Sequence, residues 1–218
     1  IIGSGKKAIL IGEETTVFEN YINKKIIEKK SLNLGDVKEV RDELNDIYKT
    51  KGLLSKKSDY IFTDKSLNNF FYLQLINNIY PHAKIINCKR NALSSIMSIL
   101  QNNLTELAWT HDLDNIFKYF NNYFNIIENY NNSNPNKIYH LEIEKLTNNP
   151  EEESKKLMKY CELPWDKNCL EFYKRKDLIS KTASNIQIRE AIFKHSLEKY
   201  LPYKKLLAEY GSKYSWFN

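Results

Sequence analysis

The feature that most constrains the fold is a run of residues 60–101 in which strand and helix patterns alternate. Short aromatic and β-branched stretches predict buried strands, and longer stretches with apolar residues at helical spacing predict helices. The predicted order is a strand at residues 60–62, a helix at 67–79 that Pro81 ends, a strand at 84–88 and a helix at 92–101. This order predicts an α/β fold with a central parallel sheet flanked by helices.

Two cations stand where the predicted strands of this run end. Lys65 closes the polar segment that follows the first strand, and Arg90 follows the second. In open α/β sheets, ligands bind beyond the carboxyl ends of the strands. The two positive charges therefore indicate an anionic ligand, a phosphate or a sulfate ester.

The rest of the chain continues the α/β pattern. Further strands are predicted at residues 8–11 and 137–141, and further helices at 16–28, within 31–51, at 114–130, at 152–161 and in the terminal segment 201–218. The segments 51–58 and 105–112 are predicted loops, and residues 131–136 are rich in Asn and contain Pro135, which predicts a turn.

The central run resembles the central block of the sulfotransferases. The resemblance is carried by T-D-K-S-L-N-N-F at residues 63–70 and by I-Y-P-H-A-K-I-I-N-C-K-R-N-A-L-S-S-I-M-S-I at residues 79–99. It is closest to bacterial members often fused to tetratricopeptide repeats and is similar to tyrosylprotein sulfotransferases. The resemblance implies a P-loop-NTPase-like sulfotransferase fold. It also implies that Lys65 contacts the transferring sulfuryl group, and that Arg90 and Ser98 bind the 3′-phosphate of the donor 3′-phosphoadenosine 5′-phosphosulfate (PAPS).

A pair of acidic residues follows the first predicted strand of the chain. From the residues alone, Glu13 and Glu14 fit the first turn of a helix, where the macrodipole favours negative charge. The segment G-E-E-T that contains them resembles a tyrosylprotein sulfotransferase motif whose second glutamate is the general base. The resemblance implies that Glu14 removes the proton of a hydroxyl acceptor.

The start of the sequence departs from the family pattern. The family's phosphosulfate loop lies about twenty residues before the base, whereas only thirteen residues precede Glu14. Residues 1–7 do not match a phosphate loop either, because the upstream Gly is missing and Lys7 replaces the Ser or Thr. We expect a sulfotransferase-like domain over residues 1–218 that is incomplete at its N-terminus, or one that has lost the loop.

A segment near the C-terminus resembles the family loop that closes over the nucleotide. It reads K-T-A-S-N-I-Q-I-R at residues 181–189. The resemblance implies that Ser184 lies near the sulfuryl group, with a catalytic and a donor-binding role. It implies donor contacts for Gln187, Arg189 and Lys199 as well. From the residues alone, a basic surface loop that caps a helix remains open.

The bulk composition limits the class of protein. The chain has 218 residues and a net charge of +6, which suits one domain with a polyanionic ligand. Cys88, Cys161 and Cys169 form no C-x-x-C pair, which argues against a zinc site or a disulfide framework. With no apolar run of about twenty residues and no signal peptide pattern, a cytoplasmic location and no transmembrane segment are expected.

The implied function is transfer of a sulfuryl group from PAPS to a hydroxyl acceptor, with no metal and no nucleic acid partner. The acceptor class, whether tyrosine, sugar, lipid or small alcohol, is left open by the sequence. Three alternatives also remain open. They are a sulfotransferase-like fragment that cannot catalyse transfer, a P-loop kinase, which the missing Walker lysine disfavours, and a basic module that binds nucleic acid or acidic glycans.

Overall fold

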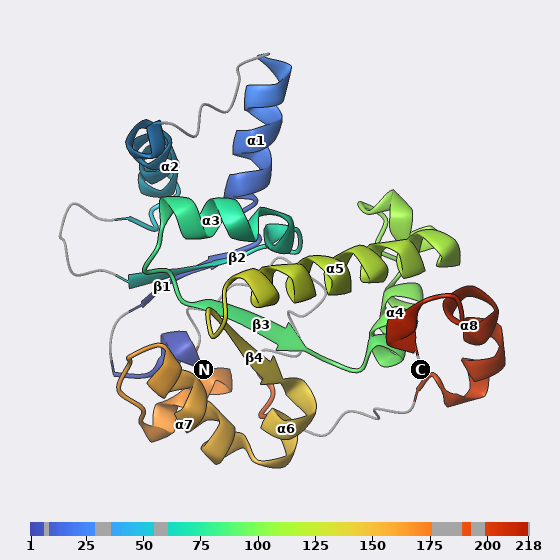
Figure 1. The fold of residues 1–218 in the computed structure, drawn as a ribbon. Helices are drawn as coiled ribbons and strands as arrows, with labels where there is room; N and C mark the ends of the chain where they lie inside the picture. Colours follow the sequence, from blue (N-terminus) through green and yellow to red (C-terminus); the bar gives the residue numbers. More distant parts are fainter. Residues whose placement is uncertain (7–8, 29–35, 55–60, 176–188, 193–198, 218) are drawn as a thin grey trace. The chain divides into compact units, whose positions relative to one another are not determined.

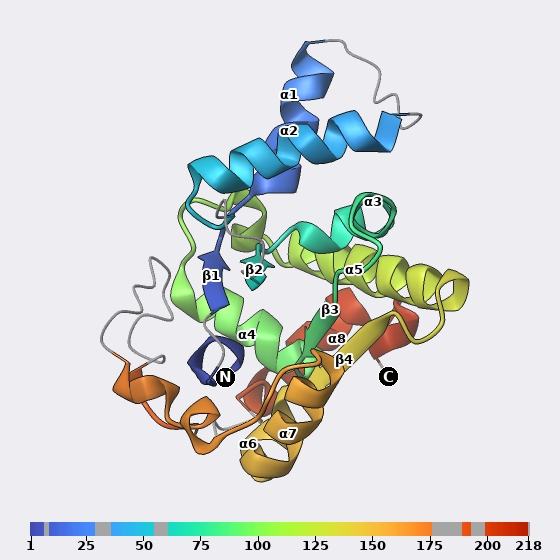
Figure 2. The same cartoon turned by 90° about the vertical axis from the view of Figure 1, so that its left-hand side faces the viewer.

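The computed structural model describes residues 1–6, 9–28, 36–54, 61–175, 189–192 and 199–217. Contacts divide the chain into two compact units (Figures 1 and 2). The first unit comprises Ile1–Lys84 and Met158–Ser180, and the second comprises Ile85–Leu157 and Lys181–Asn218. The expectation of one domain over residues 1–218 stays a prediction.

The first unit is built on a pair of parallel strands. β1 (Ile9–Glu13) pairs with β2 (Ile61–Lys65) in a register that runs from Ile9 opposite Ile61 to Glu13 opposite Lys65. Because the strands are parallel, their carboxyl ends lie together. Figure 1 shows the helices of this unit on one side of the strand pair. They are α1 (Val17–Ile27), α2 (Val37–Thr50) and α3 (Leu73–Ile79), the last preceded by the 3₁₀ turn η3 (Asn69–Tyr72).

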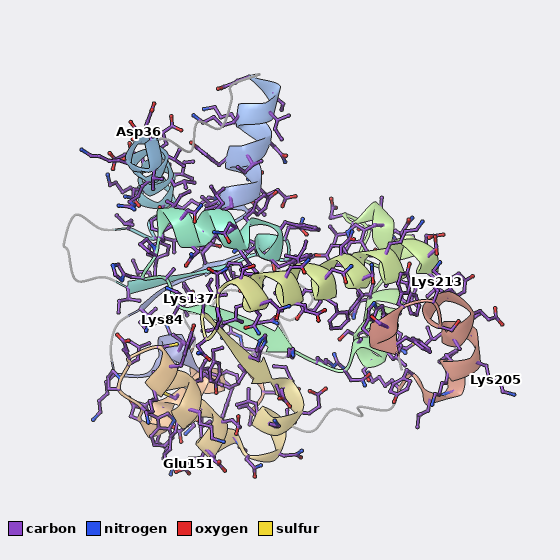
Figure 3. All side chains as sticks on the ribbon, in the orientation of Figure 1. Asp36, Lys84, Lys137, Glu151, Lys205 and Lys213 are labelled. Atoms are coloured by element: carbon purple, nitrogen blue, oxygen red, sulfur yellow. The ribbon has the colours of Figure 1, made fainter. Side chains whose placement is uncertain are left out.

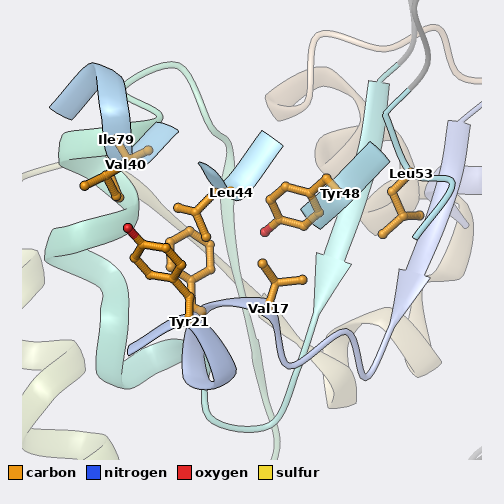
Figure 4. Close-up of a cluster of buried hydrophobic side chains, with 8 residues drawn as sticks. Val17, Tyr21, Val40, Leu44, Tyr48, Leu53 and Ile79 are labelled. Carbon is orange, nitrogen blue, oxygen red and sulfur yellow. The ribbon is translucent and has the colours of Figure 1, made fainter. Parts of the chain in front are cut away.

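The core of the first unit is made by the facing sides of these helices (Figure 4). Leu44 and Tyr48 of α2 are almost fully buried, four residues apart on one helix face. The Tyr48 ring packs on Phe62 of β2 with ring centroids 4.7 Å apart, which ties the helix layer to the strands. The buried members of this cluster are Val17, Phe18, Tyr21, Val40, Leu44, Tyr48, Leu53 and Ile79.

Helix α2 begins at a side-chain cap. The Asp36 carboxylate accepts a hydrogen bond of 2.9 Å from the backbone N–H of Glu39, and Figure 3 labels this residue at the end of the helix. The cap satisfies one of the backbone donors that the first helical turn leaves unpaired. The helix therefore starts at Val37, six residues after the first residue of the segment 31–51 in which it was predicted.

The first unit contains a second, smaller cluster of buried hydrophobic residues. Buried Ile9 of β1 packs with Met158, Leu163 and Cys169. These three residues come from the end of α7 (Pro150–Tyr160), the turn after it and the 3₁₀ turn η5 (Lys167–Cys169). The cluster explains why residues so late in the sequence belong to the unit of the N-terminal strand.

The second unit repeats the plan of parallel strands with helices. β3 (Ile85–Lys89) pairs with β4 (Ile138–Glu142), with Lys89 opposite Glu142 at the carboxyl ends. The described helices are α4 (Ala92–Asn102), α5 (Leu113–Ser133), α6 (Ile143–Asn148), α8 (Lys204–Gly211) and the part of α7 up to Leu157. Three 3₁₀ turns, η4 (Ala108–His111), η9 (Leu201–Tyr203) and η10 (Ser215–Phe217), complete the unit.

The core of the second unit joins α4, α5 and α8. Its buried members are Leu93, Ile96, Met97, Ile116, Phe117 and Leu207. Phe117 is fully buried, and the Trp216 ring stacks on it at 5.6 Å. The aromatic residues at the end of the chain, predicted only as a terminal helix and tail, are therefore part of the hydrophobic core.

The predicted α/β class is confirmed, and the strand positions are close to those expected. The main correction is at the strand ends. Residues 12–13 and 63–65 continue β1 and β2 although the strands were predicted to end at residues 11 and 62, because they pair with each other across the two strands. Glu13 and Glu14 are therefore not in the first turn of a helix, since Glu13 ends β1 and α1 begins at Val17. Similarly, α5 continues through the Asn-rich residues to Ser133, where the Asn134 N–H bonds to the carbonyl of Tyr130 at 2.8 Å.

We predict that Gly12→Ala destabilises the chain by about 2–3 kcal/mol, because the site has no room for a methyl group. A Cβ at Gly12 would lie 2.4 Å from the carbonyl oxygen of Thr63 and 2.7 Å from the Leu53 side chain. The matched control is Gly52→Ala, where the space is open and only the φ of 73° opposes the change, at about 1 kcal/mol. Urea unfolding would measure both. A Gly12→Ala variant no less stable than Gly52→Ala would contradict the close packing.

Candidate active site

The carboxyl ends of β1 and β2 bring Glu14 and Lys65 into direct contact. The Lys65 Nζ lies 2.6 Å from Glu14 Oε1 and 3.3 Å from Glu13 Oε1. The Lys65 and Glu14 side chains are 55% and 37% exposed, so solvent and ligands can reach them. Two residues predicted to act on the same reaction, 51 positions apart in the chain, therefore form one ion pair.

The turn after β1 has two residues with positive φ, and in this turn the Glu14 side chain reaches Lys65 at the end of β2. Glu14 and Thr16 have φ of 46° and 50°, a left-handed conformation that few residues other than glycine adopt. Hydrogen bonds from the β2 side hold the turn in place. Thr16 N–H donates to Ser66 Oγ at 2.8 Å, and Leu67 N–H donates to Glu14 Oε2 at 3.3 Å. Strained residues held in this way are often functional.

The carboxylate of Asp64 stabilises this turn through hydrogen bonds. It accepts hydrogen bonds from Thr15 Oγ1 at 2.5 Å, from Asn69 Nδ2 at 3.1 Å and from the hydroxyl of Tyr48. Burial, together with the negative charge of Asp64, raises the pKa of Tyr48 far above its ordinary value. Tyr48 therefore remains a protonated donor at any physiological pH.

Three residues of this arrangement were not predicted as part of the site. Glu13 is the second carboxylate on Lys65, Asp64 is the acceptor beneath the turn, and Ser66 holds the turn. The sequence feature that could have indicated Asp64 and Ser66 as site residues is their position on either side of Lys65 in T-D-K-S. Their partners in residues 15, 16 and 48, however, come from distant parts of the chain, and sequence spacing does not reveal them.

In the second unit, the structure brings Arg90 and Ser98 together. Arg90 follows β3, and Ser98 lies on the second turn of α4, with Arg90 Nη1 at 3.3 Å from Ser98 Oγ. The Ser98 hydroxyl in turn donates to the carbonyl of Ser94 at 3.0 Å, which leaves its oxygen facing the guanidinium. Among the described residues, no carboxylate lies within ion-pair distance of Arg90. This half-buried cation is therefore available to an anion.

The loop between β3 and α4 is fixed by Asn91. Its side chain caps the helix by accepting from Ser94 N–H at 2.9 Å, and its own N–H donates to Glu144 Oε1 at 2.8 Å. The cap sets where the helix starts, and hence where Ser98 lies relative to Arg90. The positive end of the α4 dipole lies beside Arg90 and adds to the attraction for an anion.

A chain of polar side chains lies behind this strand end. Tyr123 donates to Asn87 Oδ1 at 2.8 Å, and Asn87 Nδ2 lies 3.3 Å from His140 Nδ1. Burial, with a contribution from nearby Lys89, lowers the pKa of His140, so its ring is neutral at neutral pH. The network joins β3, β4 and α5 through side-chain hydrogen bonds.

The remaining predicted site residues are in the C-terminal segment. Ser184 and Gln187 lie outside the described residues. Arg189 and Lys199 are described, and both side chains are exposed. Their proposed contacts with a donor stay predictions.

The described part of the chain holds no group of three or more His, Cys, Asp or Glu side chains arranged for a metal ion. Within the same residues, no helix combines the length and the apolar character needed to cross a membrane. No disulfide joins Cys88, Cys161 or Cys169, and of the three only Cys169 is buried.

The residue pattern of the sulfotransferase family matches residues 23–167, about two thirds of the chain. The chain belongs to the sulfotransferase family. The matched range contains Lys65, Arg90 and Ser98. It begins after Glu14 and ends before Ser184, so the proposed base and the C-terminal segment rest on the motifs alone.

Two further comparisons found similar proteins. A protein of Aquifex aeolicus (strain VF5), described as uncharacterized, is 38% identical over 148 residues, which is 66% of this chain. The match spans only 19% of that longer protein. The structure is also similar to the sulfotransferase domain from the curacin biosynthetic pathway, with a TM-score of 0.51 and 15% identity, over 82% of this chain and 64% of that one. At this identity the likeness shows a shared sulfotransferase fold.

We predict that Tyr48→Phe destabilises the chain by about 2 kcal/mol, because it removes a donor to the charged Asp64 carboxylate. The matched control is Tyr80→Phe. Tyr80 belongs to the same aromatic cluster, and its hydroxyl donates to the neutral amide of Asn45 at 2.9 Å. That change should cost about 1 kcal/mol. If urea unfolding finds that both variants lose the same free energy of unfolding, the hydrogen bond to the Asp64 carboxylate contributes no more than one to a neutral amide.

Proposed function

We propose that the chain is a PAPS-dependent sulfotransferase that transfers a sulfuryl group to a hydroxyl acceptor. The observation that carries the proposal is the contact between Arg90 and Ser98, since a guanidinium without a carboxylate partner and a hydroxyl side by side suit a phosphate monoester. Within the family, we further propose that the chain is most similar to the bacterial tetratricopeptide-linked sulfotransferases and is similar to the tyrosylprotein sulfotransferases.

The donor's 3′-phosphate is assigned to Arg90 and Ser98. A guanidinium can bind two phosphate oxygens at once, and the Ser98 hydroxyl can donate to a third once it turns away from the Ser94 carbonyl. The N-terminal turn of α4 adds a favourable dipole. Arg189, Lys199, Ser184 and Gln187 are proposed as further donor contacts on the strength of the family resemblance.

The reacting groups are assigned to Glu14 and Lys65. The acceptor oxygen attacks sulfur and forms a new O–S bond, while the bond between sulfur and the bridging 5′-phosphate oxygen breaks. The electron pair leaves with 3′-phosphoadenosine 5′-phosphate, and the acceptor's proton passes to Glu14. Lys65, helped by Ser184, stabilises the negative charge on the transferring group and on the leaving oxygen.

In the chain without ligand, Glu14 is paired with Lys65, so the first step of the proposed mechanism is the separation of this ion pair. Glu14 holds Lys65 at 2.6 Å and must turn toward the acceptor to accept its proton. Glu13, at 3.3 Å, then remains as the counter-ion of Lys65. Glu14 is thus proposed as the base and Glu13 as the residue that positions the lysine.

We predict that the chain binds 3′-phosphoadenosine 5′-phosphate, and that Arg90→Ala weakens this binding about 100-fold, because the charge-assisted bonds of a half-buried guanidinium to the 3′-phosphate are lost. Binding of 5′-AMP, which lacks the 3′-phosphate, should be weak with or without Arg90. The matched control is Lys118→Ala, which removes one positive charge from an exposed site on α5 in the same unit. Calorimetric titration that finds equal losses for Arg90→Ala and Lys118→Ala would contradict a specific phosphate site.

We also predict that Glu14→Gln lowers kcat by about 10²–10⁴-fold, because the amide cannot accept the proton of the acceptor. Glu13→Gln should lower kcat less than about tenfold, since it leaves the base in place. Both variants should bind 3′-phosphoadenosine 5′-phosphate as the parent chain does. Similar kcat losses for the two variants in a sulfuryl-transfer assay would remove the distinction between base and positioning residue.

A further inference from the structure

The first turn of α4 is held by a carboxylate from a distant part of the chain. The Asn91 side chain accepts a hydrogen bond of 2.9 Å from the N–H of Ser94, and the Asn91 N–H donates to Glu144 Oε1 at 2.8 Å. In a capping box, a Glu or Gln three residues into the helix accepts the second of these bonds. Ser94 occupies that position here, and Glu144, 53 positions from Asn91, accepts the bond instead.

The register of the strand pair places Glu144 beside Asn91. β3 and β4 run side by side in the same direction and end with Lys89 opposite Glu142 (Figure 1). Asn91 lies two residues beyond the end of β3, and Glu144 lies two residues beyond the end of β4, in the first turn of α6. The two residues therefore meet because parallel pairing carries both segments past the same edge of the strand pair.

The contact also fixes the two groups assigned to the 3′-phosphate. Arg90 is the single residue between the end of β3 and Asn91, so its backbone is held on both sides. Ser98 lies on α4, whose first turn is held by Asn91. The distance of 3.3 Å between Arg90 Nη1 and Ser98 Oγ therefore depends on where Asn91 lies. Without the Glu144 acceptor, the Asn91 N–H would need another partner, and this segment could shift.

The carboxylate of Glu144 acts as a hydrogen-bond acceptor and not as a counter-ion. It binds a backbone N–H, and among the described residues no carboxylate lies within ion-pair distance of Arg90. The Arg90 charge therefore stays available to a phosphate. A negative charge close to a bound phosphate would weaken its binding, so the charge of Glu144 brings no advantage here. An amide oxygen at the same place should accept the bond equally well.

The same two hydrogen bonds limit the groups that can recognise the phosphate. Phosphates at helix N-termini commonly bind backbone N–H groups. The N–H groups of Asn91 and Ser94 are both occupied by protein side chains. Recognition of the 3′-phosphate is therefore left mainly to the side chains of Arg90 and Ser98, whose separation has to be held accurately.

We propose that Glu144 is a positioning residue for the donor's 3′-phosphate, which holds Asn91 so that Arg90 and Ser98 lie together. It acts through Asn91 and does not bind the phosphate itself. The proposal rests on the proposed sulfotransferase function and adds to it the residue through which β4 and α6 hold the nucleotide site in place.

The test measures binding of 3′-phosphoadenosine 5′-phosphate by calorimetric titration in three variants of Glu144. Glu144→Ala removes the acceptor and should weaken binding about tenfold. Glu144→Asp keeps the charge but is one methylene shorter, so it should also weaken binding because its carboxylate does not reach the Asn91 N–H. Glu144→Gln removes the charge but keeps an acceptor oxygen at the same reach, so binding should stay within about threefold. With PAPS as donor, Glu144→Ala should raise KM about tenfold and change kcat less than about twofold.

A double-mutant cycle shows whether Glu144 acts through Arg90. In the Arg90→Ala background, Glu144→Ala should weaken binding by less than about twofold further, because the group that it positions is already missing. The matched control is Glu128→Ala, which removes an exposed carboxylate from α5 in the same unit and should change binding less than about twofold. A full loss in both backgrounds, or an equal effect of Glu144→Ala and Glu128→Ala, would overturn the proposal.

Hydrogen exchange at the Asn91 amide monitors the contact without any nucleotide. Exchange should be faster in Glu144→Ala and Glu144→Asp and unchanged in Glu144→Gln. The Asp and Gln variants keep the comparison decisive if Glu144→Ala does not fold. If the parent chain binds the nucleotide and Glu144→Asp binds it better than Glu144→Gln, the positioning role fails alone. If the parent chain does not bind the nucleotide, the proposed sulfotransferase function fails together with it.

Discussion

The arrangement of the first unit depends on the carboxylate of Asp64. It joins three elements through single hydrogen bonds, namely the turn after β1 at Thr15, helix α2 at Tyr48 and the 3₁₀ turn η3 at Asn69. A partly buried carboxylate needs such donors, and their loss would leave an uncompensated charge. Because Asp64 is next to Lys65 in β2, the same bonds that stabilise the fold also fix the turn that carries Glu14.

The two cations at the strand ends have opposite electrostatic surroundings. Lys65 is held by two carboxylates, so an incoming anion meets a site whose positive charge is already compensated. Arg90 has a hydroxyl beside it and, among the described residues, no carboxylate within ion-pair distance, although the Glu144 carboxylate accepts from the N–H of the next residue, Asn91. This difference fits a reaction in which the donor is bound through a phosphate at Arg90, and in which Lys65 becomes available once Glu14 turns to the acceptor.

Much of the fold and part of the site could be predicted from the sequence. The alternation of apolar runs located the four strands of the described residues. Lys65 and Arg90 could be located at strand ends and Ser98 on the next helix, while their roles stay predictions. The lengths of β1 and β2 could not be predicted, since residues 12–13 and 63–65 are polar or small and become strand only by pairing with each other. The left-handed turn at Glu14 and the bonds from Tyr48 and Thr15 to Asp64 depend on partners 16 to 53 residues away, which local patterns do not contain.

The central claim is that the chain transfers a sulfuryl group from a donor recognised by its 3′-phosphate. The most direct test is to incubate it with PAPS carrying a radiolabelled sulfuryl group and a mixture of hydroxyl acceptors, alongside labelled adenosine 5′-phosphosulfate, which lacks the 3′-phosphate. The account predicts label on an acceptor with PAPS and little or none with adenosine 5′-phosphosulfate. No transfer from PAPS, or equal transfer from both donors, would contradict it.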